Sequence, residues 1–152
     1  MIIDYGNKVK SLLSNKGDKK VVFTNGCFDI LHIGHIEALK DSSKMGELLI
    51  VGINGDKSVK ELKGDSRPIN SETNRLKFLE AIRWVDGVII YTDLRATEAI
   101  KYCRPDVYTK SSDYNLENMD KGEVSALKEL KAEIIITPLI GGFSTTRILD
   151  LY

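Results

Sequence analysis

The stretch that most constrains the fold is VVFTNGCFDILHIGH, which spans residues 21–35. Its apolar start ends at Asn25-Gly26, a pattern typical of a buried strand that stops at a tight turn. Apolar residues at helical spacing follow from position 33. The chain therefore passes from a strand to a helix within a few residues. Backbone N–H groups are unpaired at a helix start, and the helix dipole favours negative charge there.

His32 and His35 stand at this junction and are the two histidines of the chain. A single histidine beside an apolar run is usually a structural residue, and a short HxGH pattern also arises by chance. Here the strand, the turn, Phe28-Asp29, the histidine pair and the helix follow one another without a break. Because two imidazoles beside a helix N-terminus can bind phosphate, the stretch predicts a phosphate site.

Composition restricts the class of protein. The 152 residues include 42% hydrophobic residues, and 22 basic residues balance 22 acidic ones. A general nucleic-acid or membrane-surface binder would normally be basic, so neither partner is expected. No apolar run approaches the roughly 20 residues that span a bilayer, and no signal peptide is evident. Cys27 and Cys103 form no CxxC motif, so the expectation is a cytoplasmic protein with reduced thiols.

Apolar patterns and turn residues divide the chain into alternating strands and helices. Strands are expected at 20–24, 48–53, 88–91, 106–108 and 133–137, and helices at 2–16, 34–44, 57–62, from 71, at 94–102 and 122–131, and after 144. This alternation predicts an α/β, Rossmann-like single domain over residues 1–152, with a five-stranded, mostly parallel sheet and helices on both faces. Residues 1–18 are expected to form a helix that packs on the core of residues 19–152 or on a second subunit.

Polar turns follow four of the expected strands, at residues 24–35, 54–56, 110–114 and 138–146. The carboxyl ends of parallel strands lie at one edge of a sheet, and ligands bind there. The four turns should therefore converge on one site. The charged segment 60–70 follows the second strand, and it either covers that site or forms a solvated loop.

Several well-known site motifs are missing. The chain has no GxGxxG after the first strand, no GxxxxGK[ST] and no GxSxG, which argues against a dinucleotide fingerprint, a P-loop and a nucleophile elbow. The expected site instead carries basic side chains and hydroxyls: His32, His35, Lys60, Lys63, Arg75, Arg83, Ser144, Thr145 and Thr146. Basic groups beside a Ser/Thr-rich helix start suit a polyphosphate.

On these motifs the chain resembles the nucleotidyltransferase superfamily marked by HxGH, whose members resemble the catalytic core of class I aminoacyl-tRNA synthetases. FTNGCFDILHIGH, LKGDSRPIN and GGFSTT are most similar to the adenylyltransferase branch of bacterial ADP-heptose synthesis, over about residues 20–150. The resemblance implies that an NTP, ATP in that branch, reacts with a sugar phosphate such as D-glycero-D-manno-heptose 1-phosphate. The products would be an ADP-heptose type of nucleotide-sugar and pyrophosphate, for lipopolysaccharide, a capsule or another glycoconjugate.

Two departures keep alternatives open. Residues 110–114 read KSSDY where the heptose branch usually has KGGDY, and Arg83 in IRWVDGV resembles glycerol-3-phosphate cytidylyltransferases. A cytidylyltransferase that uses CTP and a polyol phosphate such as glycerol 3-phosphate is therefore the first alternative. A nucleotide-binding module without catalysis is the second.

The resemblance implies a role for each residue of the expected site. The expected catalytic residues are His32, His35 and Lys63. The expected nucleotide-binding residues are Thr24, Asn25, Gly26, Cys27, Phe28, Gly34, Asn54, Asp56, Arg83, Ser144, Thr145 and Thr146. The expected acceptor-binding residues are Asp29, Lys60, Arg67, Arg75, Lys110 and Asp113, although Asp29 is open to a structural role in its turn and Arg75 to a pairing with an acid on its helix. Mg²⁺ is expected on the nucleotide's phosphates with no protein metal site, and a homodimer is expected as the assembly.

Overall fold

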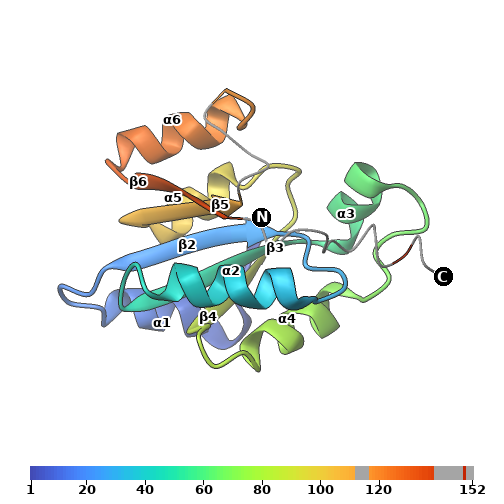
Figure 1. Cartoon of the computed structure of the whole chain (residues 1–152), viewed down its shortest axis with the longest axis horizontal. Helices are drawn as coiled ribbons and strands as arrows, with labels where there is room; N and C mark the ends of the chain where they lie inside the picture. The colour runs from blue at the N-terminus through green and yellow to red at the C-terminus, as the bar shows by residue number, and fades with distance from the viewer. Residues whose placement is uncertain (112–116, 139–148, 150–152) are drawn as a thin grey trace.

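A computed structural model of the chain describes residues 1–111, 117–138 and 149. Strands and helices alternate along it (Figure 1). In chain order the elements are β1 (Ile2–Ile3), the 3₁₀ helix η1 (Tyr5–Asn7), α1 (Lys8–Ser14), β2 (Val21–Gly26), α2 (Ile33–Ser43), β3 (Leu48–Asn54), α3 (Asp56–Lys63), α4 (Glu72–Glu80), β4 (Gly87–Tyr91), α5 (Thr97–Cys103), β5 (Val107–Ser111), α6 (Lys121–Glu129) and β6 (Glu133–Thr137). Apart from residue 149, the helix predicted after residue 144 lies outside the described residues.

The described strands form one six-stranded sheet in the order β1-β4-β3-β2-β5-β6. β1 pairs antiparallel with β4, and the other neighbours pair in parallel. The predicted Rossmann-like α/β fold is thus confirmed. From β2 the chain proceeds to β3 and β4 on one side, and it then returns to β5 and β6 on the other. The strand order therefore reverses between β2 and β5, the place where such sheets bind ligands.

The prediction of five strands and of one helix over residues 2–16 was wrong at the N-terminus. Ile2 and Ile3 form an edge strand that pairs with Tyr91 and Ile90 of β4. The helix begins only after Gly6, whose φ of 64° is left-handed. The Asp4 carboxylate accepts hydrogen bonds from two backbone N–H groups of α1. An isoleucine pair suits a strand as well as a helix, so apolar spacing alone did not separate the two structures.

Two hydrophobic clusters fill the two faces of the sheet. One cluster lies under α1, α5 and α6 and includes Val9, Ile100 and Leu127, and the other lies under α2 and α4 and includes Leu39 and Leu79. Helices on both faces are visible in Figure 1. All seven residues of β3 are buried, as the uninterrupted apolar run predicted. The apolar side of α1 is covered by this chain's own core, so that helix does not by itself call for a second subunit.

No helix in the described part of the chain is both long enough and apolar enough to cross a membrane. The helix α3 stands beyond the carboxyl ends of the strands, on the right in Figure 1, where the sheet leaves an open end.

The packing of α4 gives a test of the fold. Leu79 is fully buried against the sheet, whereas its neighbour Phe78 is 43% exposed. Replacing Leu79 by Ala should lower the free energy of unfolding by about 2–5 kcal/mol, because it removes apolar contacts and leaves a cavity. Replacing Phe78 by Ala should cost clearly less. Urea denaturation of both variants measures the difference, and equal losses would contradict the assigned face of α4.

Candidate functional site

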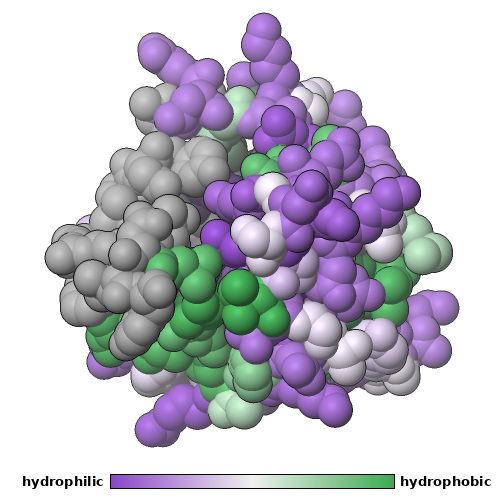
Figure 2. All heavy atoms as spheres, turned by 90° about the vertical axis from the view of Figure 1, so that its right-hand side faces the viewer, coloured by the Kyte–Doolittle hydropathy of each residue, from purple (hydrophilic) through white to green (hydrophobic). Residues whose placement is uncertain are grey.

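A cavity of about 460 Å³ opens at the carboxyl ends of the strands. It is lined by Thr24, Asn25, Gly26, Cys27, Phe28, Asp29, His32, Gly34, His35, Ala38, Leu39, Ser42, Asn54, Leu62, Lys63, Arg67, Tyr91, Leu94, Arg95, Thr109, Lys110, Ser111, Asn118, Met119, Asp120, Glu123, Thr137 and Pro138. The surface on this side of the molecule is largely hydrophilic, with apolar side chains gathered in the lower part of the view (Figure 2). The cavity thus lies where the strand order reverses, as the topology predicts.

The predicted site residues divide into three groups. Those that line the cavity are Thr24, Asn25, Gly26, Cys27, Phe28, Asp29, His32, Gly34, His35, Asn54, Lys63, Arg67 and Lys110. Those that do not line it are Asp56, Lys60, Arg75 and Arg83. Asp113, Ser144, Thr145 and Thr146 lie outside the described residues.

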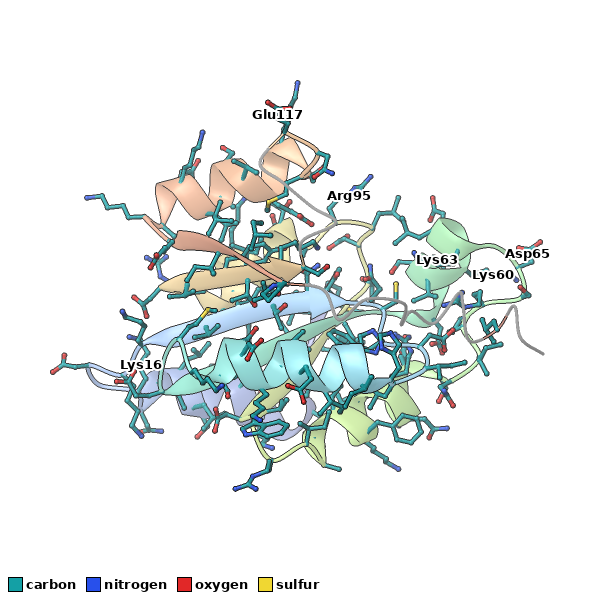
Figure 3. All side chains as sticks on the ribbon, in the orientation of Figure 1. Lys16, Lys60, Lys63, Asp65, Arg95 and Glu117 are labelled. Atoms are coloured by element: carbon teal, nitrogen blue, oxygen red, sulfur yellow. The ribbon has the colours of Figure 1, made fainter. Side chains whose placement is uncertain are left out.

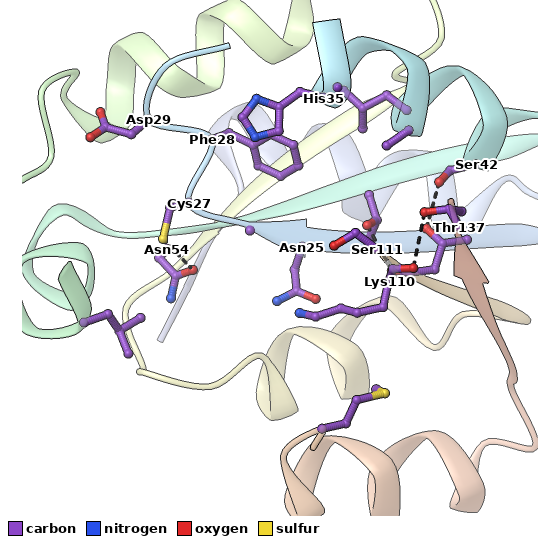
Figure 4. A pocket seen from close by; sticks show the side chains of 18 of the residues that line it. Asn25, Cys27, Phe28, Asp29, His35, Ser42, Asn54, Lys110, Ser111 and Thr137 are labelled. Carbon is purple, nitrogen blue, oxygen red and sulfur yellow. Dashed lines mark hydrogen bonds between the residues drawn. The ribbon is translucent and has the colours of Figure 1, made fainter. Parts of the chain in front are cut away.

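The histidines form a stacked pair on one side of the cavity. Their ring centroids are 3.8 Å apart, and the His35 ring also lies 5.0 Å from that of Phe28. His32 occupies the N-cap position of α2, so both rings stand beside the start of that helix. Figure 4 shows the His35 ring over Phe28 at the edge of the cavity. This arrangement places two imidazoles next to unpaired N–H groups, which favours an anion.

Burial disfavours the charged form of both imidazoles. It lowers the pKa of His32, and burial together with the neighbouring His32 lowers the pKa of His35 to about 4. The Nδ1 atoms of both rings are buried and have no hydrogen-bond partner within the described part of the chain. A neutral imidazole can still donate one N–H bond, and an anion would favour the charged form. The pair is therefore suited to a ligand that carries negative charge.

Asp29 fixes the loop of residues 64–70 to the turn that follows β2. Its carboxylate accepts hydrogen bonds from Arg67 Nε at 2.7 Å and from the backbone N–H groups of Ile69 and Asn70 at 2.9 Å. The Asn70 side chain in turn donates to the Asp29 backbone carbonyl at 2.6 Å. Burial alone would raise the pKa of Asp29, but these hydrogen bonds outweigh it and hold the pKa below its usual value. Asp29 thus holds its turn against residues 67–70, the structural role that the sequence left open, and its carboxylate points away from the middle of the cavity in Figure 4.

Arg75 also has a structural role in this chain. It is fully buried, and its guanidinium donates to the Cys27 and Asn70 backbone carbonyls and to the Asp56 carboxylate, at 2.7, 3.0 and 2.8 Å. The predicted pairing with an acid occurs, but the acid is on α3 rather than on the same helix. Arg75 and Asp56 therefore join the turn after β2, the loop at Asn70 and α3 to one another. Neither residue lines the cavity.

A chain of polar side chains forms the floor of the cavity. The Tyr108 hydroxyl donates to Asn25 Oδ1, the Asn25 amide donates to the Tyr91 hydroxyl at 3.0 Å, and that hydroxyl donates to Asn54 Oδ1 at 2.9 Å. Cys27 Sγ lies 3.7 Å from the same Asn54 oxygen. Burial raises the pKa of the Cys27 thiol. These bonds fix the Asn25 and Asn54 amides, and Figure 4 shows the Lys110 side chain extending toward Asn25.

Hydroxyl groups join the strand ends on the wall opposite α3. Ser42 Oγ and Thr109 Oγ1 are 2.8 Å apart, Thr24 Oγ1 donates to the Thr109 carbonyl at 3.0 Å, and Thr137 Oγ1 donates to the Lys110 carbonyl at 3.2 Å. These bonds tie β2, β5, β6 and α2 to one another. The wall is thus preorganised by contacts between residues that are far apart in the sequence.

Two of the basic residues predicted for the site lie elsewhere. Arg83 is exposed beside Trp84, with its guanidinium carbon 5.9 Å from the ring centroid. It lies beyond α4, which carries Arg75 and ends at Glu80. Lys60 is exposed on α3, whereas Lys63 at the end of that helix lines the cavity.

Arg95 and the start of α6 complete the cavity, and the sequence reasoning missed both. Arg95 follows β4, and the residues that precede or begin α6 include Asn118, Asp120 and Glu123. Figure 3 shows Lys60, Lys63 and Arg95 at the open end of the sheet and Lys16 at the opposite end. The carboxyl end of β4 lies at the same edge of the sheet as the other parallel strand ends. The position of Arg95 after β4 could therefore have predicted that it reaches the cavity.

The sequence and the structure both match known proteins. The model of the cytidylyltransferase-like family matches residues 23–149. A protein named bifunctional protein HldE from Campylobacter jejuni subsp. doylei is 45% identical over 97% of this chain and 32% of that protein, and HldE from Koribacter versatilis is 42% identical over 89% of this chain and 27% of that protein. This chain thus spans about a third or less of the length of these relatives.

Two solved structures share the fold. The lipopolysaccharide core biosynthesis protein from Thermoplasma volcanium superposes with a TM-score of 0.64 at 28% identity, over 80% of this chain and 96% of that one. Pantoate-beta-alanine ligase from Francisella tularensis, complexed with an ATP ligand and beta-alanine, has a TM-score of 0.53 at 15% identity, over 86% of this chain and 65% of that one. The second likeness concerns the fold alone.

The Asp29 contacts predict a pH-dependent contribution to stability. The pKa of Asp29 is lowered in the folded protein, so its contribution is complete above the unfolded pKa of about 4 and is lost as the pH falls through the lower folded pKa. Asp29→Asn removes a buried charge opposite Arg67 and should cost about 2–4 kcal/mol near neutral pH. Unfolding curves of both proteins from pH 7 to pH 3 should converge toward acid. A constant difference would contradict this role, and Asp18→Asn, at an exposed aspartate, is the control.

The histidine pair predicts an unusual titration. In the ligand-free folded protein, His35 should stay neutral down to about pH 4 because burial and His32 oppose its protonation. Imidazole ¹⁵N chemical shifts measured by NMR across pH 4–8 report the charge, and the protein in urea should titrate near the ordinary value of about 6.5. A folded His35 that titrates near that value would show that the ring is solvated and the site is arranged differently.

Proposed function

The cytidylyltransferase-like family is the family to which this chain belongs, and on that premise we propose that it transfers a nucleotidyl group from an NTP to a phosphorylated acceptor. The observation that carries the proposal is the stacked His32 and His35 pair at the start of α2, on a cavity at the switch point of the sheet. A triphosphate would bring the negative charge that this helix end and the two rings lack.

The proposed reaction is a direct displacement at phosphorus. An oxygen of the acceptor's phosphate attacks the α-phosphorus of the NTP, a new P–O bond forms, and the bond to the leaving pyrophosphate breaks with its electron pair. The acceptor oxygen is already anionic, so no strong general base is required. His32 and His35 would donate hydrogen bonds to α- and β-phosphate oxygens, and Lys63 would neutralise developing charge.

A divalent cation fits the proposal only as a companion of the nucleotide. Within the described ranges, no three His, Cys, Asp or Glu side chains are grouped as a metal site. Mg²⁺ keeps most of its water and binds through few carboxylates together with substrate phosphates. Such an ion would supply charge neutralisation of the triphosphate, held mainly by nucleotide oxygens.

We propose ATP and a heptose 1-phosphate as the substrates. This choice is supported by the 41–45% identity to HldE from Campylobacter jejuni, and by the motif resemblance to the adenylyltransferase branch of ADP-heptose synthesis. The fold shared with a lipopolysaccharide core biosynthesis protein agrees with it. CTP with a polyol phosphate remains the second candidate, because the Ser111 side chain lines the cavity where the heptose branch usually has glycine.

A pyrophosphate-release screen tests the proposal. ATP and CTP are each combined with D-glycero-D-manno-heptose 1-phosphate and with glycerol 3-phosphate, and we expect the ATP and heptose combination to be fastest. Release with CTP and glycerol 3-phosphate instead would select the second candidate. Nucleotide binding without release in any combination would indicate a binding module without catalysis.

The variant His35→Ala ties the activity to the site. It should lower turnover by about 100-fold or more, the size of losing a positioned donor to a charged transition state. Lys101→Ala, a charge removed from the exposed side of α5, is the control and should leave turnover unchanged. Normal turnover in folded His35→Ala would reject the proposed role of the pair.

A further inference from the structure

The cavity extends across the edge of the sheet, from one face to the other. On one side, Phe28 and Leu39 beside the histidines belong to the hydrophobic cluster under α2 and α4. On the other side, Ala96 and Met119 belong to the cluster under α1, α5 and α6. Arg95 therefore lines the cavity on the side opposite the histidine pair.

The backbone on both sides of Arg95 is held by buried groups. The Leu94 carbonyl accepts a hydrogen bond from the Asn54 side chain at 3.4 Å, and the Ala96 N–H donates to the Glu123 carboxylate at 2.8 Å. Asn54 and Glu123 are themselves buried. The position of Arg95 at the rim is thus fixed by the floor of the cavity and by α6.

The guanidinium itself is loosely held. The Arg95 side chain is 62% exposed, and its Nε lies 3.6 Å from Asp120 Oδ2, beyond hydrogen-bond distance. Asp120 has a different strong contact, because its Oδ1 caps α6 by accepting from the Glu123 N–H at 3.0 Å. A cation with an anchored backbone and a weak ion pair can change partner at little cost when a stronger anion arrives.

We propose that Arg95 binds the phosphate group of the acceptor substrate, exchanging Asp120 for that phosphate. The inference rests on the proposed nucleotidyl transfer. In a direct displacement the incoming oxygen approaches opposite the leaving pyrophosphate. With the triphosphate on the histidine side, the acceptor phosphate must come from the side of Arg95. A planar guanidinium can hold two oxygens of a phosphate at once, which orients the third toward the α-phosphorus.

Calorimetry on the whole chain tests the assignment. The protein is saturated with α,β-methylene ATP, which cannot release pyrophosphate, and D-glycero-D-manno-heptose 1-phosphate and glycerol 3-phosphate are titrated in turn. For whichever phosphate binds the wild type, Arg95→Ala should weaken binding about tenfold or more, as expected for a lost charge-assisted contact. Arg95→Lys should recover part of the loss, and affinity for the ATP analogue should stay the same. Lys101→Ala is the charge-matched control.

Asp120→Asn separates exchange from a purely structural role. Asparagine keeps the oxygen that caps α6 but removes the charge that competes for Arg95. The variant should therefore bind the acceptor more tightly than the wild type, an effect that a scaffold residue would not produce.

Three results would overturn the inference: unchanged acceptor affinity in Arg95→Ala, a loss on the ATP analogue instead of the acceptor, or a wild type that binds neither phosphate. Failure of the proposed function looks different. A wild type that binds the acceptor through Arg95 but releases no pyrophosphate from any NTP would contradict the transfer reaction and leave the assignment of Arg95 standing.

Discussion

The buried Asp29 carboxylate is the contact on which the shape of the site depends. It joins the turn after β2 to residues 67–70, with Arg67 and two backbone N–H groups as donors. Arg75 makes a second connection between the same two segments, through the carbonyls of Cys27 and Asn70. Because breaking a buried ion pair leaves an uncompensated charge, this region resists rearrangement. The cavity wall that includes Cys27, Asp29 and Arg67 is therefore held in place by contacts within the chain itself.

The candidate site combines two kinds of group. Burial disfavours the charged form of the histidine pair, and its Nδ1 atoms are unpartnered in the described residues. Lys63 and Arg95 are exposed basic residues that line the cavity. Preorganised donors on one side and adaptable cations on the other suit two anionic substrates that must meet at one phosphorus atom. The proposed transfer would thus rest on positioning rather than on a strong base.

The sequence was sufficient for the Rossmann-like architecture, apart from the N-terminal edge strand, and for the residues of the turn after β2. VVFTNGCFDILHIGH predicted the strand, the helix start and the histidine pair, because strand, turn and cap signals are local. The contacts of Arg75 and Asp56 could not be predicted, since they depend on how α3 and α4 meet beneath the first turn. Ile2 and Ile3 form a strand because the edge of β4 is available for pairing. No local sequence pattern reveals that this edge is free. The position of Arg95 at the end of β4 could have been predicted from the topology, but no sequence motif marks this residue.

A co-crystal structure with α,β-methylene ATP tests the central claim most directly, that the histidine pair and the start of α2 hold the triphosphate. The claim predicts an α- or β-phosphate oxygen within about 3 Å of a ring nitrogen of His35, with the histidine rings and the Asp29 contacts unchanged. A triphosphate bound on the Arg95 side of the cavity, with the histidines free of phosphate, would contradict it.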